Sequence, residues 1–451
     1  MSSSADDPIA ALATPAASSA LAVIRVSGAG SLELLRPLVG SRWDPASAAG
    51  HTIHRCVLVD GKEPVDEVLV AVYRSPRSYT GEDGAEIFCH GSLPVITRLL
   101  STLGRGGFRP AGPGEFTQRA FLNGRMGLTQ AEAVNEIVQA RTDRARGLAL
   151  ARLAGAIEDR VRRARDSLAD LKAGLEVLID YPDEEQEAGP LIDLAGLREA
   201  REALQSLVAS YRQGRVFQEG VAVALAGATN CGKSRLFNLL LRQDRAIVSD
   251  THGTTRDWLE ATVSLGGIPV RLIDTAGLRP STDPLESEGI RRTREVMASA
   301  DIVVYLVDGT RGESGTDGSA LAEAGSAVPV IKAWNKTDLA GCRPAPEEFV
   351  AISAATGSGR EELERRICEA ALGGPPKDST EPLVDSDRQR DLLVRAVAAL
   401  DRFEAAHAQG TAADLLSVDL ADCLDALGEI SGAVTSAEIL DRMFARFCVG
   451  K

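Results

Sequence analysis

Hydrophobic and polar positions follow three different patterns along this chain of 451 residues. Up to residue 122, short apolar runs alternate with turns that are rich in Gly and Pro, which is typical of strands. Four such runs lie at residues 21–26, 56–60, 68–73 and 85–89. The pattern therefore predicts an α+β domain over residues 1–122.

Two later stretches, 123–215 and 384–447, place apolar residues at helical spacing. Pro182 and its acidic neighbours interrupt the first of them. We therefore expect an all-helical domain in two parts, residues 123–215 and 380–451. The residues at helical spacing include Ala133, Ile137, Leu168, Leu171, Leu175, Leu178, Leu392, Leu393, Val397, Leu400, Leu415, Val418, Leu424 and Leu427.

Residues 216–379 alternate apolar strands with helical stretches, which is typical of a parallel sheet with crossover helices. A Gly-Gly-Pro-Pro segment at 373–376 has the composition of a linker. The simplest arrangement is an α/β domain inserted into the split helical domain. The expected fold class is multidomain, combining α/β and α+β folds.

The composition narrows the class of protein. The apolar fraction of 44% allows each domain a core, and the longest apolar runs, such as 302–307, are far shorter than the roughly 20 residues that cross a bilayer. The first residues lack the basic and apolar segments of a secretory signal. Seven widely spaced cysteines without a Cys-x-x-Cys pair argue against a disulfide framework and a structural zinc site. We expect a reduced, cytoplasmic protein with no membrane segment.

The net charge of −14 argues against nucleic-acid binding across the whole surface. Any RNA contact must use a local basic patch or a more basic partner. Residues 141–165 contain eight arginines against three acidic residues. Two interpretations remain open: a helical face for RNA phosphates, or a solvated face paired with acidic residues elsewhere.

The apolar run at 221–226 ends in a phosphate-binding motif. Residues 227–234 read Gly-Ala-Thr-Asn-Cys-Gly-Lys-Ser, and a helical stretch follows, which is the context that a G-x4-G-K-S loop requires. Its glycines let backbone N–H groups surround phosphates, and the helix N-terminus adds positive potential. Lys233 is expected to reach the outer phosphates, and Ser234 to offer its hydroxyl to Mg²⁺.

Further nucleotide motifs follow in order. Asp274 begins Asp-Thr-Ala-Gly after the run at 270–273; it is expected to hold Mg²⁺ through water, while the Gly277 amide senses the γ-phosphate. Asn335 begins Asn-Lys-Thr-Asp after 330–334. The Asp338 carboxylate can accept hydrogen bonds from N1–H and the 2-amino group of guanine, a donor pair that adenine lacks. Lys336 can lie over the base plane.

Two weaker segments complete the site. Ser353-Ala354 follows a short apolar run, where a backbone amide would meet the guanine oxygen, and residues 249–257 belong to the loop that closes over the γ-phosphate. Thr255 is the candidate for a second Mg²⁺ hydroxyl, although an ordinary polar turn is the alternative. The motifs together predict a GTPase. The predicted GTP-binding residues are Asn230, Cys231, Gly232, Lys233, Ser234, Arg235, Ser249, Thr251, Gly253, Thr254, Thr255, Asp274, Thr275, Ala276, Gly277, Asn335, Lys336, Asp338, Ser353, Ala354 and Ala355.

The nucleotide motifs, with Gly-Thr-Thr-Arg-Asp at 253–257, resemble the group that includes the ribosome-assembly GTPases. Four flanking segments narrow the resemblance: Ala-x-Ala-Thr-Pro at 11–15, SYTGED at 78–83, PGEFTQRAFLNGRMGLTQAEA at 113–133 and the terminal FCVGK at 447–451. Together they resemble the tRNA-modification GTPase MnmE (TrmE) family over almost the whole chain. Residues 16–20 depart from the Gly- and Arg-rich loop that this family usually has there.

The resemblance implies an N-terminal folate-binding domain similar to glycine-cleavage T-protein, a split helical domain and an inserted Ras-like P-loop domain. It also implies a homodimer, joined through the N-terminal domains, that forms a heterotetramer with an FAD-dependent partner, MnmG (GidA). Such complexes add an aminomethyl or carboxymethylaminomethyl group to C5 of the wobble uridine of certain tRNAs. A tetrahydrofolate derivative donates the carbon.

The resemblance further implies roles for single residues. The K⁺ site would use the Asn230 side chain, the carbonyls of Ser249 and Thr251 and the hydroxyl of Thr254. The general base would be Glu286. The folate contacts would be Arg25, Glu82, Arg125 and Lys451.

Leu278 stands where Ras-type enzymes have a glutamine just after the Asp-Thr-Ala-Gly motif, and a leucine cannot orient water. No arginine finger is evident from the sequence, although Arg256 and Arg279 remain open as candidates. We hypothesise that K⁺ stabilises charge on the transferring phosphoryl group when two GTPase domains meet. Glu286 is expected to orient water, although a solvated acidic loop is the alternative. Cys448 is a possible functional thiol, or an inert one.

The leading hypothesis is a GTP-driven tRNA-modifying enzyme. Its main rival is a GTPase switch in ribosome assembly, which the acidic balance and the Gly-Lys tail disfavour. A third hypothesis is a folate-dependent one-carbon enzyme that GTP only regulates. Binding to the flavin partner would separate the first from the third.

Overall fold

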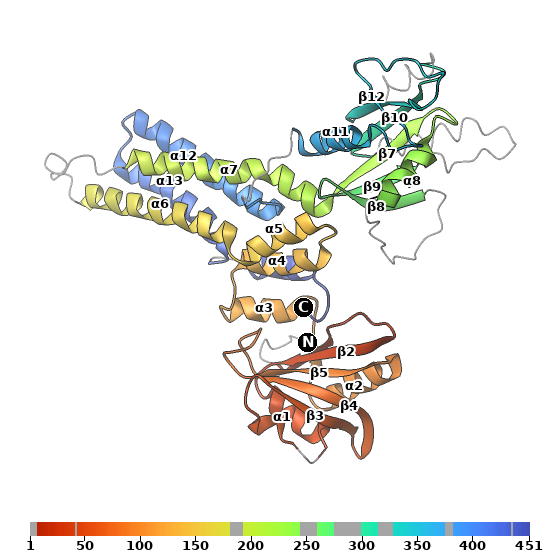
Figure 1. Ribbon diagram of the computed structural model, residues 1–451. Helices are drawn as coiled ribbons and strands as arrows, with labels where there is room; N and C mark the ends of the chain where they lie inside the picture. The colour runs from red at the N-terminus through yellow and green to blue at the C-terminus, as the bar shows by residue number, and fades with distance from the viewer. Residues whose placement is uncertain are drawn as a thin grey trace, which may run out of the picture. The chain divides into compact units, whose positions relative to one another are not determined.

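The computed structural model describes residues 7–40, 43–180, 193–243, 259–274, 299–313, 328–374, 382–433 and 436–451 (Figure 1). The chain forms two compact units. The first contains residues 1–135, 153–158 and 425–451, and the second contains 136–152 and 159–424. None of the described helices combines the length and apolarity needed to span a membrane.

The first unit contains a six-stranded sheet in the order β3-β4-β5-β2-β1-β6. Its members are β3 (Thr52–Asp60), β4 (Glu63–Tyr73), β5 (Gly84–Gly91), β2 (Ser19–Ser27), β1 (Ile9–Leu12) and β6 (Arg109–Pro110). Neighbours are antiparallel, except that β1 and β6 are parallel. All four predicted runs are confirmed as strands, whereas β1 and β6 are too short to give an alternating pattern.

Helices α1 (Ser31–Leu35) and α2 (Leu93–Arg105) share one apolar core with this sheet. Leu99 of α2 and Ile24 of β2 are both fully buried in that core. The strands alternate buried with accessible side chains, so polar residues such as Arg25 lie on the other face of β2. That face carries the polar network described below.

The rest of the first unit includes α3 (Glu115–Leu122), the start of α4 (Leu128–Gln139) and α14 (Ala437–Phe444). A small core joins Leu128 of α4 with Phe444 of α14. The last residues then run beside the N-terminal sheet, where Val449 pairs with Pro113. Gly450 has φ +94°, and a Cβ there would overlap the carbonyl oxygen of Leu12, so only glycine fits this docked tail.

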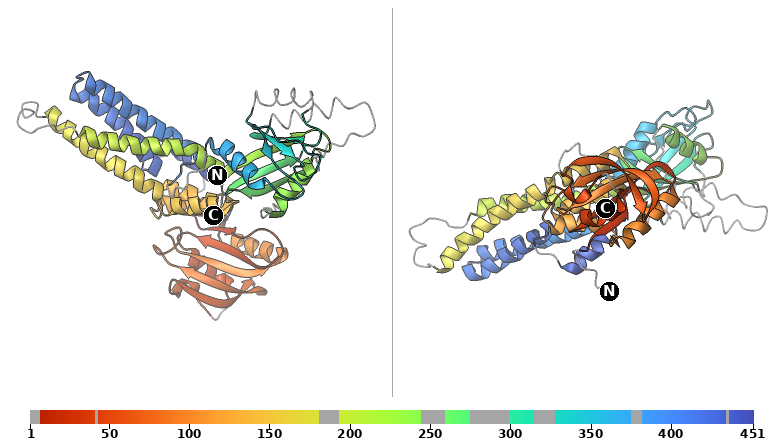
Figure 2. Two further views of the ribbon diagram at one scale, coloured as in Figure 1. Left: turned by 45° about the horizontal axis from the view of Figure 1, so that its top comes forward. Right: turned by 90° about the horizontal axis from the view of Figure 1, so that it is seen from below.

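The second unit contains helices α7 (Leu194–Glu219) and α12 (Asp387–Ala408) and most of α5 (Asp143–Leu153), α6 (Ala156–Asp180) and α13 (Ala413–Ser431). Helices α6, α7 and α12 run alongside one another (Figures 1 and 2). Leu168 and Leu175 are fully buried, as their spacing predicts. Leu415 and Val418 are 60% and 64% exposed. Their spacing therefore predicted the helix correctly, but these two residues do not lie on its buried face.

One residue of the arginine-rich segment 141–165 is clearly structural. Arg152 is 2% exposed, and its guanidinium forms ion pairs with Glu136 at 2.7 Å and Asp385 at 2.5 Å. It also donates a hydrogen bond of 3.2 Å to the carbonyl of Leu383. Because it is buried and paired, Arg152 does not belong to an RNA-binding face.

A second sheet has the order β12-β11-β10-β7-β9-β8. Its members are β12 (Val350–Ala351), β11 (Val330–Asn335), β10 (Ile302–Asp308), β7 (Val221–Gly227), β9 (Ile268–Asp274) and β8 (Leu259–Leu265). All pairs are parallel except β8 with β9, which are antiparallel. The side chains of β7 alternate between two apolar cores, with Val223 in one and Ala224 in the other. Helices α8 (Lys233–Gln243) and α11 (Arg360–Leu372) contribute to the first core.

The carboxyl ends of β7, β9, β10 and β11 meet at one edge of this sheet, which is where ligands bind in such folds. The protein is therefore multidomain, with an N-terminal domain, a helical domain and a Ras-like P-loop domain.

Candidate functional sites

The phosphate-binding loop lies between β7 and α8. Its two glycines are required by close approaches: a Cβ on Gly227 (φ +134°) would overlap the carbonyl oxygen of Leu306, and one on Gly232 (φ +109°) would overlap the Asn335 amide. Asn230, at the exposed tip, has φ +63°. These conformations turn the chain tightly enough to surround a phosphate with backbone N–H groups.

Lys233, the first residue of α8, lies inside the loop with 7% of its surface exposed. Its ammonium donates hydrogen bonds to the carbonyls of Gly227 at 2.8 Å and Ala228 at 2.9 Å. These neutral acceptors hold the side chain and leave its positive charge in place. Ser234 and Arg235 follow as exposed residues in the first turn of the helix. The loop therefore suits an anionic ligand such as a phosphate chain.

Asp274, the last residue of β9, is 1% exposed and pairs in the sheet with Leu225 of β7. Its carboxylate thus lies at the sheet edge from which the phosphate-binding loop also leaves. This placement fits a residue that holds Mg²⁺ through water, together with Ser234.

Asn335, at the end of β11, forms side-chain hydrogen bonds to two other segments of the site. It is 2% exposed, donates a 2.7 Å hydrogen bond from Nδ2 to the Cys231 carbonyl, and accepts one of 2.9 Å from the Ala354 amide. Asn335 therefore connects the phosphate-binding loop with the segment after β12. Cys231 is buried in this loop, and this burial raises the pKa of its thiol.

The segment that contains Asp338, the predicted base-recognition residue, is also held in place. Ser353 is 1% exposed, and its hydroxyl donates a 2.7 Å hydrogen bond to Oδ1 of the exposed residue Asp338. The same hydroxyl accepts from the Ala355 amide at 3.3 Å. A carboxylate has capacity for several donors, so Asp338 can still accept from a guanine edge.

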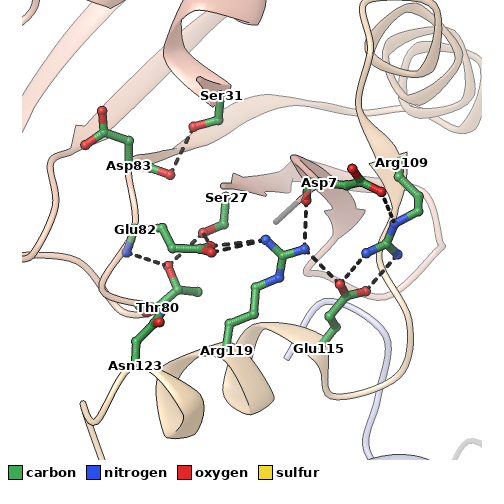
Figure 3. A network of polar contacts seen from close by, with 10 residues as sticks. All are labelled: Asp7, Ser27, Ser31, Thr80, Glu82, Asp83, Arg109, Glu115, Arg119 and Asn123. Carbon is green, nitrogen blue, oxygen red and sulfur yellow. Dashed lines mark hydrogen bonds and ion pairs between the residues drawn. The ribbon is translucent and has the colours of Figure 1, made fainter. Parts of the chain in front are cut away.

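A second polar network lies in the first unit, around Glu82 (Figure 3). The Glu82 carboxylate accepts a 2.7 Å hydrogen bond from the Ser27 hydroxyl and forms a 3.2 Å ion pair with Arg119. The Arg119 side chain is 5% exposed and also pairs with Glu115 at 3.0 Å. Glu115 pairs in turn with Arg109 at 2.5 Å. Burial alone would raise the pKa of Glu115, but hydrogen bonds from Arg109, the Gly112 amide and Arg119 hold that pKa at about 2.

Arg25 lies two positions before Ser27 on the same face of β2. Its guanidinium forms a 2.8 Å ion pair with Glu86 and donates a 3.1 Å hydrogen bond to the Gly450 carbonyl. It also lies over the rings of Tyr79 at 5.5 Å and Phe116 at 5.6 Å from their centroids. The structure thus places the C-terminal tail beside Arg25.

The four residues with predicted folate contacts lie on segments that these contacts link in part. Glu82 is linked through Ser27 to the strand that carries Arg25, and Lys451 follows Gly450. Arg125 is exposed and lies close to Gly81, the residue before Glu82, since a Cβ added to Gly81 would be 3.4 Å from the Arg125 Cδ. Sequence reasoning missed Ser27, Glu86 and Arg119, because no spacing rule links residues on separate segments to Glu82 or Arg25.

Comparison with known proteins decides the family. A family model described as "GTP-binding protein TrmE N-terminus" matches residues 8–125, and one described as "MnmE helical domain" matches residues 128–448. The tRNA modification GTPase MnmE of Geobacter metallireducens is 40% identical over 99% of this chain and 99% of its own length. The same-named proteins of Moorella thermoacetica and Parasynechococcus marenigrum are each 41% identical, over 99% of this chain and 100% of theirs.

This chain belongs to the MnmE family of tRNA modification GTPases. It is accordingly a GTP hydrolase. Nine predicted residues of this MnmE-type protein lie outside the described part of the chain: Ser249, Thr251, Gly253, Thr254, Thr255, Thr275, Ala276, Gly277 and Glu286.

The terminal Cys-Val-Gly-Lys of this MnmE-family chain carries its exposed thiol. Cys448 is the exposed one of the seven cysteines, all of which are free. Burial raises the pKa of Cys368 to about 11 and that of Cys423 to about 12. These two thiols are therefore inert at neutral pH, whereas Cys448 is accessible.

Proposed function

We propose that this protein hydrolyses GTP in order to modify tRNA, as part of a complex with the FAD-dependent partner MnmG. The modification is the addition of an aminomethyl or carboxymethylaminomethyl group to C5 of the wobble uridine, with a carbon from a tetrahydrofolate derivative. The observation that carries the proposal is the match to tRNA modification GTPases over 99% of the chain. The guanine-recognition arrangement of Asn335, Asp338 and Ser353 supports it.

The described residues divide the work on GTP. Lys233 and the N-terminus of α8 bind the phosphates, Asp338 selects guanine, and Ser234 with Asp274 would hold Mg²⁺. Bound Mg²⁺ neutralises phosphate charge. Leu278 cannot orient water, and the resemblance to the MnmE family implies that Glu286 takes this role.

Potassium dependence is part of the same proposal. Asn230 would hold K⁺ together with Ser249, Thr251 and Thr254, and Thr255 would complete the Mg²⁺ site. Bound K⁺ supplies positive charge beside the phosphates. Asn230 suits this role because it is exposed in the phosphate-binding loop, where its backbone has a positive φ. Equal hydrolysis rates in sodium and potassium, at equal ionic strength, would remove this part of the proposal.

For folate, we assign Glu82 to the N–H groups of the pterin ring, because Ser27 and Arg119 hold its carboxylate in one orientation. Arg25 already pairs with Glu86. The carboxylates of the folate tail are therefore better matched by Arg125 and Lys451, and Arg25 lines the site. Titration with 5-formyltetrahydrofolate tests this assignment, and absence of binding at high ligand concentration would refute it.

The assembly we propose is a homodimer joined through the N-terminal domains, which forms a heterotetramer with MnmG in the cytoplasm. The N-terminal folate-binding domain would span residues 1–122 and the GTPase domain 216–379, inserted between helical parts 123–215 and 380–451. Cys448 is a candidate functional thiol because it is exposed next to the docked tail.

Nucleoside mass spectrometry of tRNA from cells that lack this protein tests the central proposal. The C5 substituent should be lost at the wobble uridine, restored by the wild-type gene and not restored by Asp274→Ala. An unchanged nucleoside profile with defective ribosomal subunits would favour a ribosome-assembly switch instead.

A further inference from the structure

Asp308 is an acidic residue next to the nucleotide site that none of the nucleotide motifs includes. It ends β10, directly beside Asn335 of β11 in the parallel register. Its Oδ2 atom lies 2.6 Å from the ammonium of Lys336, and the two side chains are 11% and 28% exposed. This pair is therefore partly buried, short and located where guanine recognition takes place.

The carboxylate of Asp308 is itself held in one orientation. Its Oδ1 atom accepts hydrogen bonds from the Thr310 amide at 3.0 Å and the Thr310 hydroxyl at 2.7 Å. The next amide, of Gly309, donates to the Asn335 carbonyl at 2.9 Å. One carboxylate oxygen is thus used by the turn after β10. The other pairs with Lys336 at 2.6 Å, while the exposed guanidinium of Arg311 lies farther away at 4.0 Å.

Asp308 is ionised at neutral pH. Partial burial would raise the pKa of this carboxyl, but hydrogen bonds from Lys336 and Thr310 hold it below its usual range. Lys336 adopts a positive φ of 69° and directly follows Asn335, whose side chain donates a hydrogen bond to the Cys231 carbonyl in the phosphate-binding loop. The ion pair therefore holds the lysine side chain beside the residue that connects the two nucleotide motifs.

We propose that Asp308 is a positioning residue for guanine-nucleotide binding, which acts by holding Lys336. A free lysine side chain loses rotamer freedom when it packs against a ligand, and an ion pair that orders it beforehand removes that cost from binding. Asp308 does not touch the nucleotide in this proposal. The inference rests on the proposed role of Lys336 at the base, and the test below separates the two.

The test measures the Kd of GDP and of a non-hydrolysable GTP analogue by calorimetry. The full-length variants are Asp308→Asn, Lys336→Met and the double variant. Asp308→Asn should weaken the binding of both nucleotides by up to about tenfold, the cost of ordering one long side chain on binding. The two losses should be equal because the pair lies at the base and not at the γ-phosphate. Steady-state KM for GTP should rise while kcat is retained.

The double variant decides between positioning and other roles. If Asp308 acts through Lys336, Asp308→Asn should add no further loss to Lys336→Met. Additive losses, an unchanged Kd or tighter binding in Asp308→Asn would overturn the proposal. If Lys336→Met alone leaves the Kd unchanged, the role of Lys336 at the base fails first.

Thr310→Ala is the matched control. It removes a hydrogen bond of Asp308 within the same turn and leaves the ion pair with Lys336. If Asp308 only stabilised the turn, Thr310→Ala should weaken nucleotide binding as much as Asp308→Asn does, which would overturn the proposal. A smaller effect of Thr310→Ala on the Kd supports it.

Discussion

The nucleotide site and the Glu82 network both contain buried cations, but they compensate the charge in opposite ways. Lys233 donates to carbonyl oxygens, which leave its positive charge available for phosphates. Arg119 is instead paired with Glu82 and Glu115 before any ligand binds. The difference fits the proposed roles, because a cation without a carboxylate partner suits a multiply charged anion such as GTP. A carboxylate held in a fixed position suits the proposed recognition of a polar ring.

The largest expected effect follows from breaking the buried pairs of the Glu82 network. Arg119→Gln leaves two partly buried carboxylates without their shared cation, which should lower the free energy of unfolding by about 3–5 kcal/mol. Thermal and urea denaturation measure this loss, and 5-formyltetrahydrofolate binding should fall with it because Glu82 is no longer oriented.

Arg109→Gln is the control, since Arg109 is 29% exposed and pairs with Glu115 but not with Glu82. Its loss of stability should be smaller, and folate binding should survive. Equal effects of the two substitutions would mean that the network serves stability alone.

Removing the positive charge of Lys233 should slow GTP hydrolysis and leave the stability of the fold unchanged. Lys233→Met should lower GTP hydrolysis by about 10²–10³-fold, because a preorganised donor to the phosphates is removed. Arg242→Met, in the last turn of the same helix, is a matched control that should change little. A Lys233→Met protein that unfolds at much lower temperature would show that its carbonyl hydrogen bonds serve stability instead.

Base selection should change by a smaller factor. Asp338→Asn should weaken GTP binding by about 10²-fold, because the carboxylate that accepts from two guanine donors is lost. Xanthosine triphosphate has a carbonyl in place of the 2-amino group, so its affinity should rise in the same variant. Competition binding with both nucleotides measures the change, and an unaltered preference for GTP would place base recognition elsewhere.

The smallest expected effect is a pH dependence of the stability that Glu115 of the Glu82 network contributes to the fold. The pKa of Glu115 lies at about 2, below its usual value of 4.5. A carboxyl with a lowered pKa stabilises the fold above pH 4.5, and this contribution is lost as the pH falls towards 2. The difference in urea midpoint between wild type and Glu115→Gln should therefore be largest near pH 6 and should narrow by pH 3.5. A pH-independent difference would mean that the hydrogen bonds of Glu115 contribute without its charge.

Much of the α/β domain could be predicted because its motifs are continuous in sequence. Residues 227–234 and 335–338 each directly follow a buried strand, and a parallel sheet brings the carboxyl ends of its strands to one edge. Prediction was weaker for short or isolated features. Strands β1 and β6 are too short to show a period, and the exposed positions of Leu415 and Val418 depend on which helices pack against α13.

The sequence by itself predicted the nucleotide motifs, because the residues of each motif are near neighbours along the chain. Lys233 directly follows Gly232, and Asp338 lies three residues after Asn335. Only the tertiary structure decided the partners of these and other charges. It brought Arg25 to Gly450, Glu82 to Arg119 and Lys336 to Asp308. The physical reason is that ion pairs act over a few ångströms of space, and only folding brings segments that are distant along the chain to within that range.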